Sequence, residues 1–109
     1  MNRAEFSALM TKIFNEEINA LREAGQKEYA GGEDAFGNFN RLAAELQIDR
    51  KKVLWTYVTK HKDGIVAYLN GHESQREPVE GRINDHIVYL FLLRGMIEEE
   101  KSKANANNH

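Results

Sequence analysis

The chain has 109 residues, no cysteine, one proline and a formal net charge of −2 at pH 7. This length fits a single domain, and 41% hydrophobic with 29% charged residues is typical of a folded domain rather than a disordered one. The lack of cysteine excludes a disulfide scaffold, a thiolate metal site and a cysteine nucleophile. The small net charge argues against binding of bulk duplex DNA, which needs a basic face, whereas a small anionic ligand needs only two or three cations.

The sequence shows no targeting or membrane-spanning segment. The N-terminal stretch MNRAEFSALMTK lacks the uninterrupted apolar core of a signal peptide. The longest apolar run, residues 87–93, is far shorter than the roughly 20 residues that cross a bilayer. We therefore expect a soluble cytoplasmic protein with no membrane partner.

The first predicted helix covers residues 3–24. Asn2 is its expected N-cap, with Glu5 completing a capping box, and apolar residues recur along it at helical spacing. Gly25 is expected to end this helix. Residues 25–34, which contain a glycine pair, are expected to form a loop.

Two further helices are predicted over residues 35–46 and 50–70. Asp49 is the expected N-cap of the later one, and Gly71 its stop. A mid-helix glycine such as Gly64 costs roughly 1 kcal/mol relative to alanine, so we expect close packing or a ligand there. The residues expected to be buried are Phe36, Phe39, Leu42, Ala43 and Leu46 in the earlier helix, and Leu54, Val58, His61, Ile65, Tyr68 and Leu69 in the later one.

The last predicted helix covers residues 79–101 and begins after Pro78, a residue suited to a helix start. Its run IVYLFLL is apolar all round the helix axis, which predicts burial on more than one side, in a central helix or a seam between subunits. Residues 104–109 have nothing to bury and are expected to be disordered. The short connections then predict one all-α domain over residues 1–103, a four-helix antiparallel bundle that forms homo-oligomers through its last helix.

Polar residues near the glycine pair form the first candidate site. Lys27 offers a point charge, Tyr29 a ring able to stack on a base, and Asn38 a donor–acceptor pair that can read a base edge. Backbone N–H groups beside the glycines would be free to bind an anion. The alternative is a solvated loop whose tyrosine folds onto the core.

The two later helices carry the other candidates. His61 falls on an inward face, either as a core histidine hydrogen-bonded to backbone or to Asp85, or as part of a polar pocket with Lys60. Arg82, Asp85 and Tyr89 share one face of the last helix. There Arg82 and Asp85 form either a structural pair, or a phosphate fork beside a carboxylate that contacts a metal or a ligand hydroxyl.

Three runs of like charge have simpler interpretations. The acidic runs Glu16-Glu17 and Glu98-Glu99-Glu100 are expected to be solvated helix faces. The basic run Arg50-Lys51-Lys52 lies in the first turn of a helix, where the helix dipole disfavours it. A contact to a polyanion is a secondary interpretation of this basic run.

Three stretches carry a family resemblance: KEYAGGEDAFGNF, VLWTYVTKHKDGIVAY and ESQREPVEGRINDHIVYLFLLRGMI. In their order and spacing they resemble the phage and prophage family called nucleotide modification associated domain 1, over about two-thirds of the chain. The resemblance implies a nucleotide as ligand without naming a reaction. It also implies the host cytoplasm as the location, if the chain is phage-encoded.

A more distant resemblance is to the all-α nucleoside triphosphate pyrophosphohydrolases (MazG-like), helical dimers or tetramers that hold Mg²⁺ with an E-E-x-x-E helix and an E-x-x-D helix. Asp85 matches the last position of the second motif, but Arg82 stands where its glutamate belongs. Ala20 replaces the third glutamate after Glu16-Glu17. Because two-metal phosphoryl chemistry needs several converging carboxylates, binding is easier to support here than hydrolysis.

The leading hypothesis is a phage-type, oligomeric protein that binds a nucleotide or another phosphorylated small molecule without a cofactor. It would sequester a host defence nucleotide or deliver a nucleotide to a modifying enzyme. The predicted ligand-binding residues combine cations, a ring and an amide with one carboxylate: Lys27, Tyr29, Asn38, Lys60, His61, Arg82 and Asp85. One alternative is a Mg²⁺-dependent nucleotide pyrophosphohydrolase using Glu28, Asp63 and Asp85. Another is a structural or protein-interaction module whose function is the apolar seam of the last helix.

Overall fold

A computed structural model of the chain describes residues 1–29, 33–72 and 76–107. Within these ranges the secondary structure is entirely helical, which confirms the predicted all-α class. The elements are α1 (Arg3–Ile13), the π-helical segment η1 (Phe14–Ile18), α2 (Asn19–Tyr29), α3 (Gly37–Leu46), α4 (Arg50–Leu69) and α5 (Val79–Asn107). No helix in this part of the chain is long and apolar enough to span a membrane.

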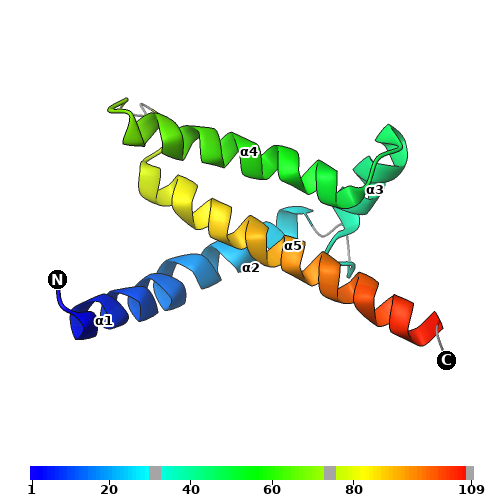
Figure 1. Cartoon of the computed structure of the whole chain (residues 1–109), viewed down its shortest axis with the longest axis horizontal. Helices are drawn as coiled ribbons and strands as arrows, with labels where there is room; N and C mark the ends of the chain where they lie inside the picture. The colour runs from blue at the N-terminus through cyan, green and yellow to red at the C-terminus, as the bar shows by residue number, and fades with distance from the viewer. Residues whose placement is uncertain (30–32, 73–75, 108–109) are drawn as a thin grey trace.

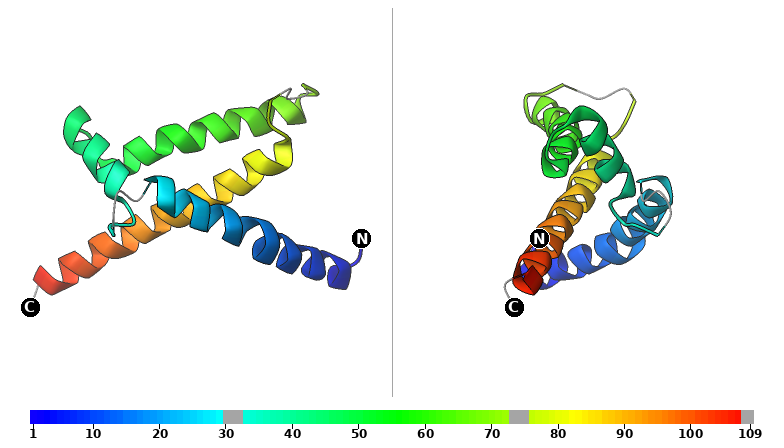
Figure 2. Two further views of the ribbon diagram at one scale, coloured as in Figure 1. Left: turned by 180° about the vertical axis from the view of Figure 1, so that it is seen from behind. Right: turned by 90° about the vertical axis from the view of Figure 1, so that its right-hand side faces the viewer.

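The bundle is built around an antiparallel pair formed by α4 and α5 (Figure 1). The continuous rod of α1, η1 and α2 crosses α5, making its contacts through η1 and α2 (Figures 1 and 2). The rod crosses α5 obliquely, so the predicted antiparallel arrangement is seen for α4 and α5 (Figure 2). The short α3 packs against α4 at the opposite end from the 70–79 connection.

Two predicted helix starts and one predicted helix stop agree with the structure, whereas α3 begins at Gly37, two residues after its predicted start. The side chain of Asn2 accepts a hydrogen bond from the backbone N–H of Glu5 at 2.8 Å, and the capping box is complete. Asp49 caps α4 by accepting from the backbone N–H of Lys51 at 2.8 Å. Gly71 follows α4 with a φ of 86°, a left-handed conformation that glycine adopts without strain.

The predicted end of the first helix is wrong, because α2 continues through Gly25 to Tyr29. One interior glycine costs about 1 kcal/mol, and the glutamine, lysine and glutamate that follow it are good helix formers. The glycine therefore lowers helix stability without ending the helix. Residues 30–32, the part of the expected loop that holds the glycine pair, lie outside the described residues.

The prediction that residues 104–109 are disordered is wrong for residues 104–107, which are helical. Helix α5 runs to Asn107, and its last six residues, 102–107, are exposed. Two alanines and a lysine favour helix in this stretch, so it extends α5 by local propensity without packing on a neighbour. Residues 108–109 are not among those described.

The hydrophobic core lies between α3, α4 and α5. The most completely buried side chains are Phe39, Leu54, Val58 and Met96, each less than 2% exposed. The two predicted stripes supply most of this core, but their outer ends do not reach it. Leu46, Tyr68 and Leu69 are exposed although their spacing predicted burial.

Ion pairs link the start of α4 to the second half of α5. Arg50 Nη1 lies 3.1 Å from Glu99 Oε1, and Lys51 Nζ lies 2.8 Å from Glu100 Oε2. The ammonium of Lys51 accordingly lowers the pKa of Glu100. The interpretation of the acidic run as a solvated face is wrong for these two glutamates, and the basic charges of Arg50 and Lys51 are matched within the chain.

Gly64 marks the close packing that its mid-helix position predicted. A Cβ built on Gly64 would lie 2.4 Å from Cδ and 2.6 Å from Nε of Arg82, so a side chain there would collide with that arginine. In contrast, a Cβ on Gly81 would meet no atom nearer than 3.7 Å. The Arg82 side chain therefore occupies the space that the missing Cβ of Gly64 leaves.

We expect Gly64→Ala to gain less stability than the roughly 1 kcal/mol that helix propensity alone would give, because the flexible end of the Arg82 side chain must move away from the new Cβ. Gly81→Ala is the matched control, and we expect it to be neutral or to stabilise by up to about 1 kcal/mol. Urea denaturation followed by circular dichroism measures both values. An equal gain in stability for the two variants would contradict the packing described.

Candidate functional site

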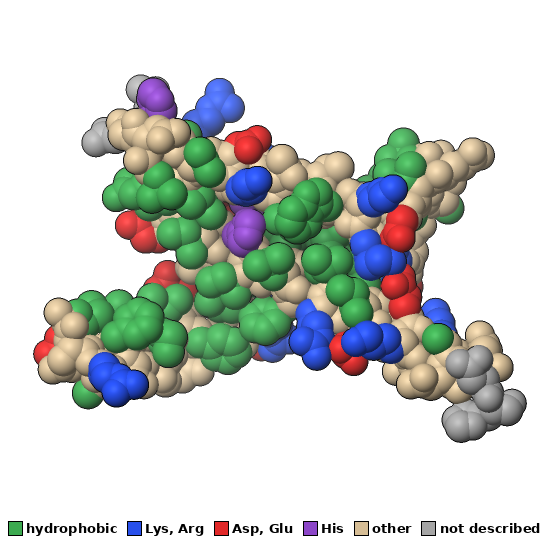
Figure 3. Space-filling model, viewed as in Figure 1, with side chains coloured by type: hydrophobic (Ala, Val, Ile, Leu, Met, Phe, Trp, Pro, Cys, Tyr) green, Lys and Arg blue, Asp and Glu red, His purple; other side chains and the backbone are tan. Residues whose placement is uncertain are grey.

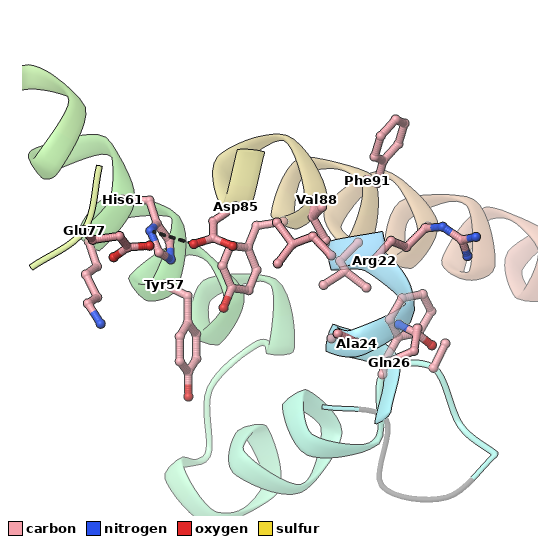
Figure 4. A pocket seen from close by; sticks show the side chains of 17 residues that line it. Arg22, Ala24, Gln26, Tyr57, His61, Glu77, Asp85, Val88 and Phe91 are labelled. Atoms are coloured by element: carbon pink, nitrogen blue, oxygen red, sulfur yellow. Dashed lines mark ion pairs between the residues drawn. The ribbon is translucent and has the colours of Figure 1, made fainter. Parts of the chain in front are cut away.

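A cavity of about 570 Å³ opens between α2, α4 and α5 (Figure 4). Its lining comes from residues 21–26 of α2, from Ala35 and Phe36, from the middle of α4, from Glu77 and from residues 85–95 of α5. The cavity lies where the first rod crosses the α4–α5 pair, so it depends on all three elements being in place.

Aromatic rings form one wall of the cavity. The rings of Tyr57 and Tyr89 are stacked, with centroids 5.9 Å apart and an interplanar angle of 22°. The imidazole of His61 also stacks on the ring of Tyr89, with centroids 5.4 Å apart and an interplanar angle of 25°. Such a run of flat faces is suited to contact with another planar ring.

The polar end of the cavity brings together His61 from α4, Asp85 from α5 and Glu77 from just before α5 (Figure 4). Nδ1 of His61 lies 3.6 Å from Oδ2 of Asp85, longer than a hydrogen bond. Burial raises the pKa of Asp85 to about 6, and its hydrogen bond with Glu77 adds to the rise. The Asp85 carboxyl is therefore partly protonated in mildly acidic solution.

Burial also lowers the pKa of His61. Its imidazole is consequently neutral at pH 7, and the contact with Asp85 does not join two full charges. The exposed side chain of Lys60 lies beside this polar end, and the exposed Arg22 lies across the cavity on α2. Neutral and acidic groups thus lie inside, with two cations at the rim.

The structure brings three of the seven predicted site residues together: Lys60, His61 and Asp85 line the cavity. Asn38 lies in the first turn of α3, half-buried and away from the lining. Lys27 and Tyr29 are in the last turn of α2, but their side chains lie outside the described part of the structure.

Arg82 does not face the cavity, because its side chain lies over Gly64. Its Nε is buried and has no hydrogen-bond partner in the described part of the chain. The structural interpretation of an Arg82–Asp85 pair is not seen either, since the Asp85 carboxyl faces His61 and Glu77. The charge of the Arg82 guanidinium still affects the site. It adds to the lowering of the His61 pKa that burial causes, and it opposes the rise of the Asp85 pKa.

The acidic set predicted for the hydrolase alternative is not assembled. Asp63 is exposed on α4 and does not line the cavity, and the Glu28 side chain is outside the described residues. Glu17, expected to be solvated, instead accepts a hydrogen bond from the buried Asn84 at 3.1 Å. Glu17 of the first rod thus contacts α5 at Asn84, the residue before Asp85.

Sequence reasoning missed Glu77, Tyr57 and Arg22. Tyr57 had a local signal, because it precedes His61 by four residues and so shares its helix face. Glu77 had none, since only the turn of the chain before Pro78 brings it back to α4. Arg22 lies on a helix whose crossing of α5 is a tertiary feature.

No protein-family model, curated protein or solved structure matches this chain significantly. The resemblance to the nucleotide modification associated family therefore stays a prediction.

The raised pKa of Asp85 has a consequence for stability. A carboxyl that binds its proton more tightly in the folded than in the unfolded state costs stability as pH rises, here from about 4 to about 6. We therefore expect Asp85→Asn to become more stable relative to wild type across this window, by an amount on the order of 2 kcal/mol. Urea denaturation at pH 4 and pH 7 in EDTA measures the change.

The exposed Asp63→Asn is the control for this pH comparison, and its stability relative to wild type should stay nearly constant. A stability difference between wild type and Asp85→Asn that does not vary with pH would show that Asp85 titrates normally.

Proposed function

We propose that this protein binds a nucleotide in the cavity between α2, α4 and α5. The observation that carries the proposal is the combination, in one cavity, of stacked aromatic rings with a polar end and rim cations. A volume of about 570 Å³ is within the range of small-molecule sites, which are mostly apolar with a few polar groups.

Each part of a nucleotide has a matching part of the cavity. The base would contact the apolar and aromatic wall near Tyr57 and Tyr89. The ribose hydroxyls would donate to the carboxylates of Asp85 and Glu77, which accept hydrogen bonds when ionised. The phosphates would lie towards the rim, where Lys60 supplies a point charge.

Binding is supported more strongly than hydrolysis. Among the described residues, two carboxyl groups, those of Asp85 and Glu77, meet at the polar end beside His61, whereas two-metal hydrolysis needs several carboxylates converging on Mg²⁺. A protein that binds a nucleotide without turning it over can sequester it or deliver it to a modifying enzyme. These are the two roles that we propose.

Isothermal titration with mono-, di- and cyclic nucleotides, in EDTA, tests the proposal. We expect one class of nucleotide to bind, and Lys60→Gln to weaken its binding about tenfold or more, because a charge-assisted contact to phosphate is lost. Lys62→Gln is the matched control, since Lys62 is an exposed neighbour outside the cavity lining.

Two results would overturn nucleotide binding in this cavity: no heat from any nucleotide with folded protein, or equal affinities for the two lysine variants. Release of pyrophosphate from a triphosphate panel with Mg²⁺ would instead favour the hydrolase.

The sequence predicts self-association through the last helix, whereas we propose that the protein self-associates through an apolar surface on the first rod, which we call the α1 face. It consists of Phe6, Leu9, Met10 and Phe14, each at least 37% exposed. Phe14 meets Phe91 of α5 edge to face, with centroids 6.5 Å apart, so the face continues onto α5. Figure 3 shows hydrophobic side chains gathered along α1 and across the adjoining part of α5.

The extended shape of the chain favours a second copy of the protein as the partner that covers the α1 face. The Cα radius of gyration is 16.5 Å, against about 13 Å for a compact chain of this length. Among the described residues, α1 packs on no element except its own continuation. A second copy supplies the same apolar face in a symmetric pairing.

Light scattering after size exclusion should give a mass at a multiple of 12.5 kDa. We expect the double variant Phe6→Ser with Met10→Ser to shift to the single-chain mass, because the association loses its apolar contact. Leu69→Ser is the control, since this leucine is 73% exposed but outside the α1 face. A wild-type protein that is monomeric at about 100 μM, or a double variant of unchanged mass, would contradict self-association through this face.

A further inference from the structure

We propose that His61, Glu77 and Asp85 form a binding site for one divalent transition-metal ion of the Zn²⁺ or Mn²⁺ kind. Each residue offers one ligand atom, and the three atoms lie within 4.8 Å of one another. The inference goes beyond nucleotide binding, because the site would hold its ion in the absence of any nucleotide.

The geometry requires only small side-chain movements. Ligand atoms at about 2.1 Å from a tetrahedral zinc are about 3.4 Å apart. Nδ1 of His61 is already 3.6 Å from Oδ2 of Asp85, near this spacing. Glu77 points towards the same place from the opposite side (Figure 4), so rotation of flexible carboxylates closes the remaining gap.

The buried imidazole is the independent sign of a missing ligand. His61 is 7% exposed, and its Nδ1 has no hydrogen-bond partner within the described residues. A buried nitrogen without a partner is costly. This nitrogen lies 3.6 Å from Oδ2 of Asp85, and a metal ion held between His61, Asp85 and Glu77 would satisfy it.

The ligand set selects the class of metal. An imidazole with two carboxylates suits zinc, manganese or iron, whereas Mg²⁺ prefers oxygen ligands only. This set also differs from the all-carboxylate motifs that the distant resemblance to the pyrophosphohydrolases implies. Because the three residues lie on the wall of an open cavity, the remaining coordination position faces the space proposed for the ligand.

The three metal-binding residues come from separate parts of the chain, so a bound ion would also cross-link these parts. His61 is on α4, Asp85 is on α5, and Glu77 lies in the connection between these helices. An ion bound to the folded but not the unfolded chain stabilises the fold by mass action. Metal binding should therefore raise the melting temperature of the protein.

The test is titration of the EDTA-treated, dialysed full-length protein with Zn²⁺, Mn²⁺ and Mg²⁺, without nucleotide. We expect one Zn²⁺ or Mn²⁺ per chain with a rise in melting temperature, and much weaker binding of Mg²⁺. His61→Gln and Asp85→Asn should each weaken Zn²⁺ binding at least tenfold. The exposed His72→Gln, which removes a histidine outside the cluster, should leave the affinity unchanged.

A second measurement needs no variant. In the wild-type protein, Mn²⁺ should broaden the NMR signals of His61 and Asp85 before those of His72. The proposal is overturned if the folded protein binds neither ion below about 100 μM, if the His61 and His72 variants have equal affinity, or if Mn²⁺ broadens the His72 signals first. Because nucleotide binding is measured in EDTA, either proposal can fail while the other holds.

Discussion

The structure depends on the packing of α4 against α5. Leu54 and Val58 on α4 meet Tyr89 and Met96 on α5 in the buried core, and removing these side chains from water is the main favourable term available to a chain of this size. The same pairing sets His61 opposite Asp85 and brings the chain before α5 back to the cavity. The candidate site is therefore a direct product of the core, and a substitution that moves one helix along the other would separate its groups.

Helix positions could be predicted from the sequence because their signals are local. Capping by Asn2 and Asp49 and the stop at Gly71 each involve residues within one turn of each other. His61 and Asp85 were identified because each is a polar residue in an apolar stripe. Burial was harder to predict, since periodicity shows which face is apolar but not whether another segment covers it, and Leu69 at the end of α4 is uncovered.

The errors at the candidate site have a different origin. Arg82 and Asp85 both face α4, but Arg82 lies over Gly64, one turn along α4 from His61, and so does not line the cavity. Glu77 belongs to a polar connection whose composition gives no sign of a buried destination. Both outcomes are decided by contacts between segments far apart in the chain, and such contacts leave no periodic pattern in one sequence.

The π-helical segment η1 has a consequence for how the first rod presents its surfaces. A π-turn accommodates one residue more than an α-turn, and each residue of an α-helix turns the side-chain direction by about 100°. The segment therefore rotates the side-chain directions of α1 relative to those of α2. It allows Ile18 to be buried against the body of the molecule while the apolar residues of α1 face outward. Deleting a single residue from Phe14–Ile18 would undo this rotation of α1 relative to α2 without altering the composition of either helix.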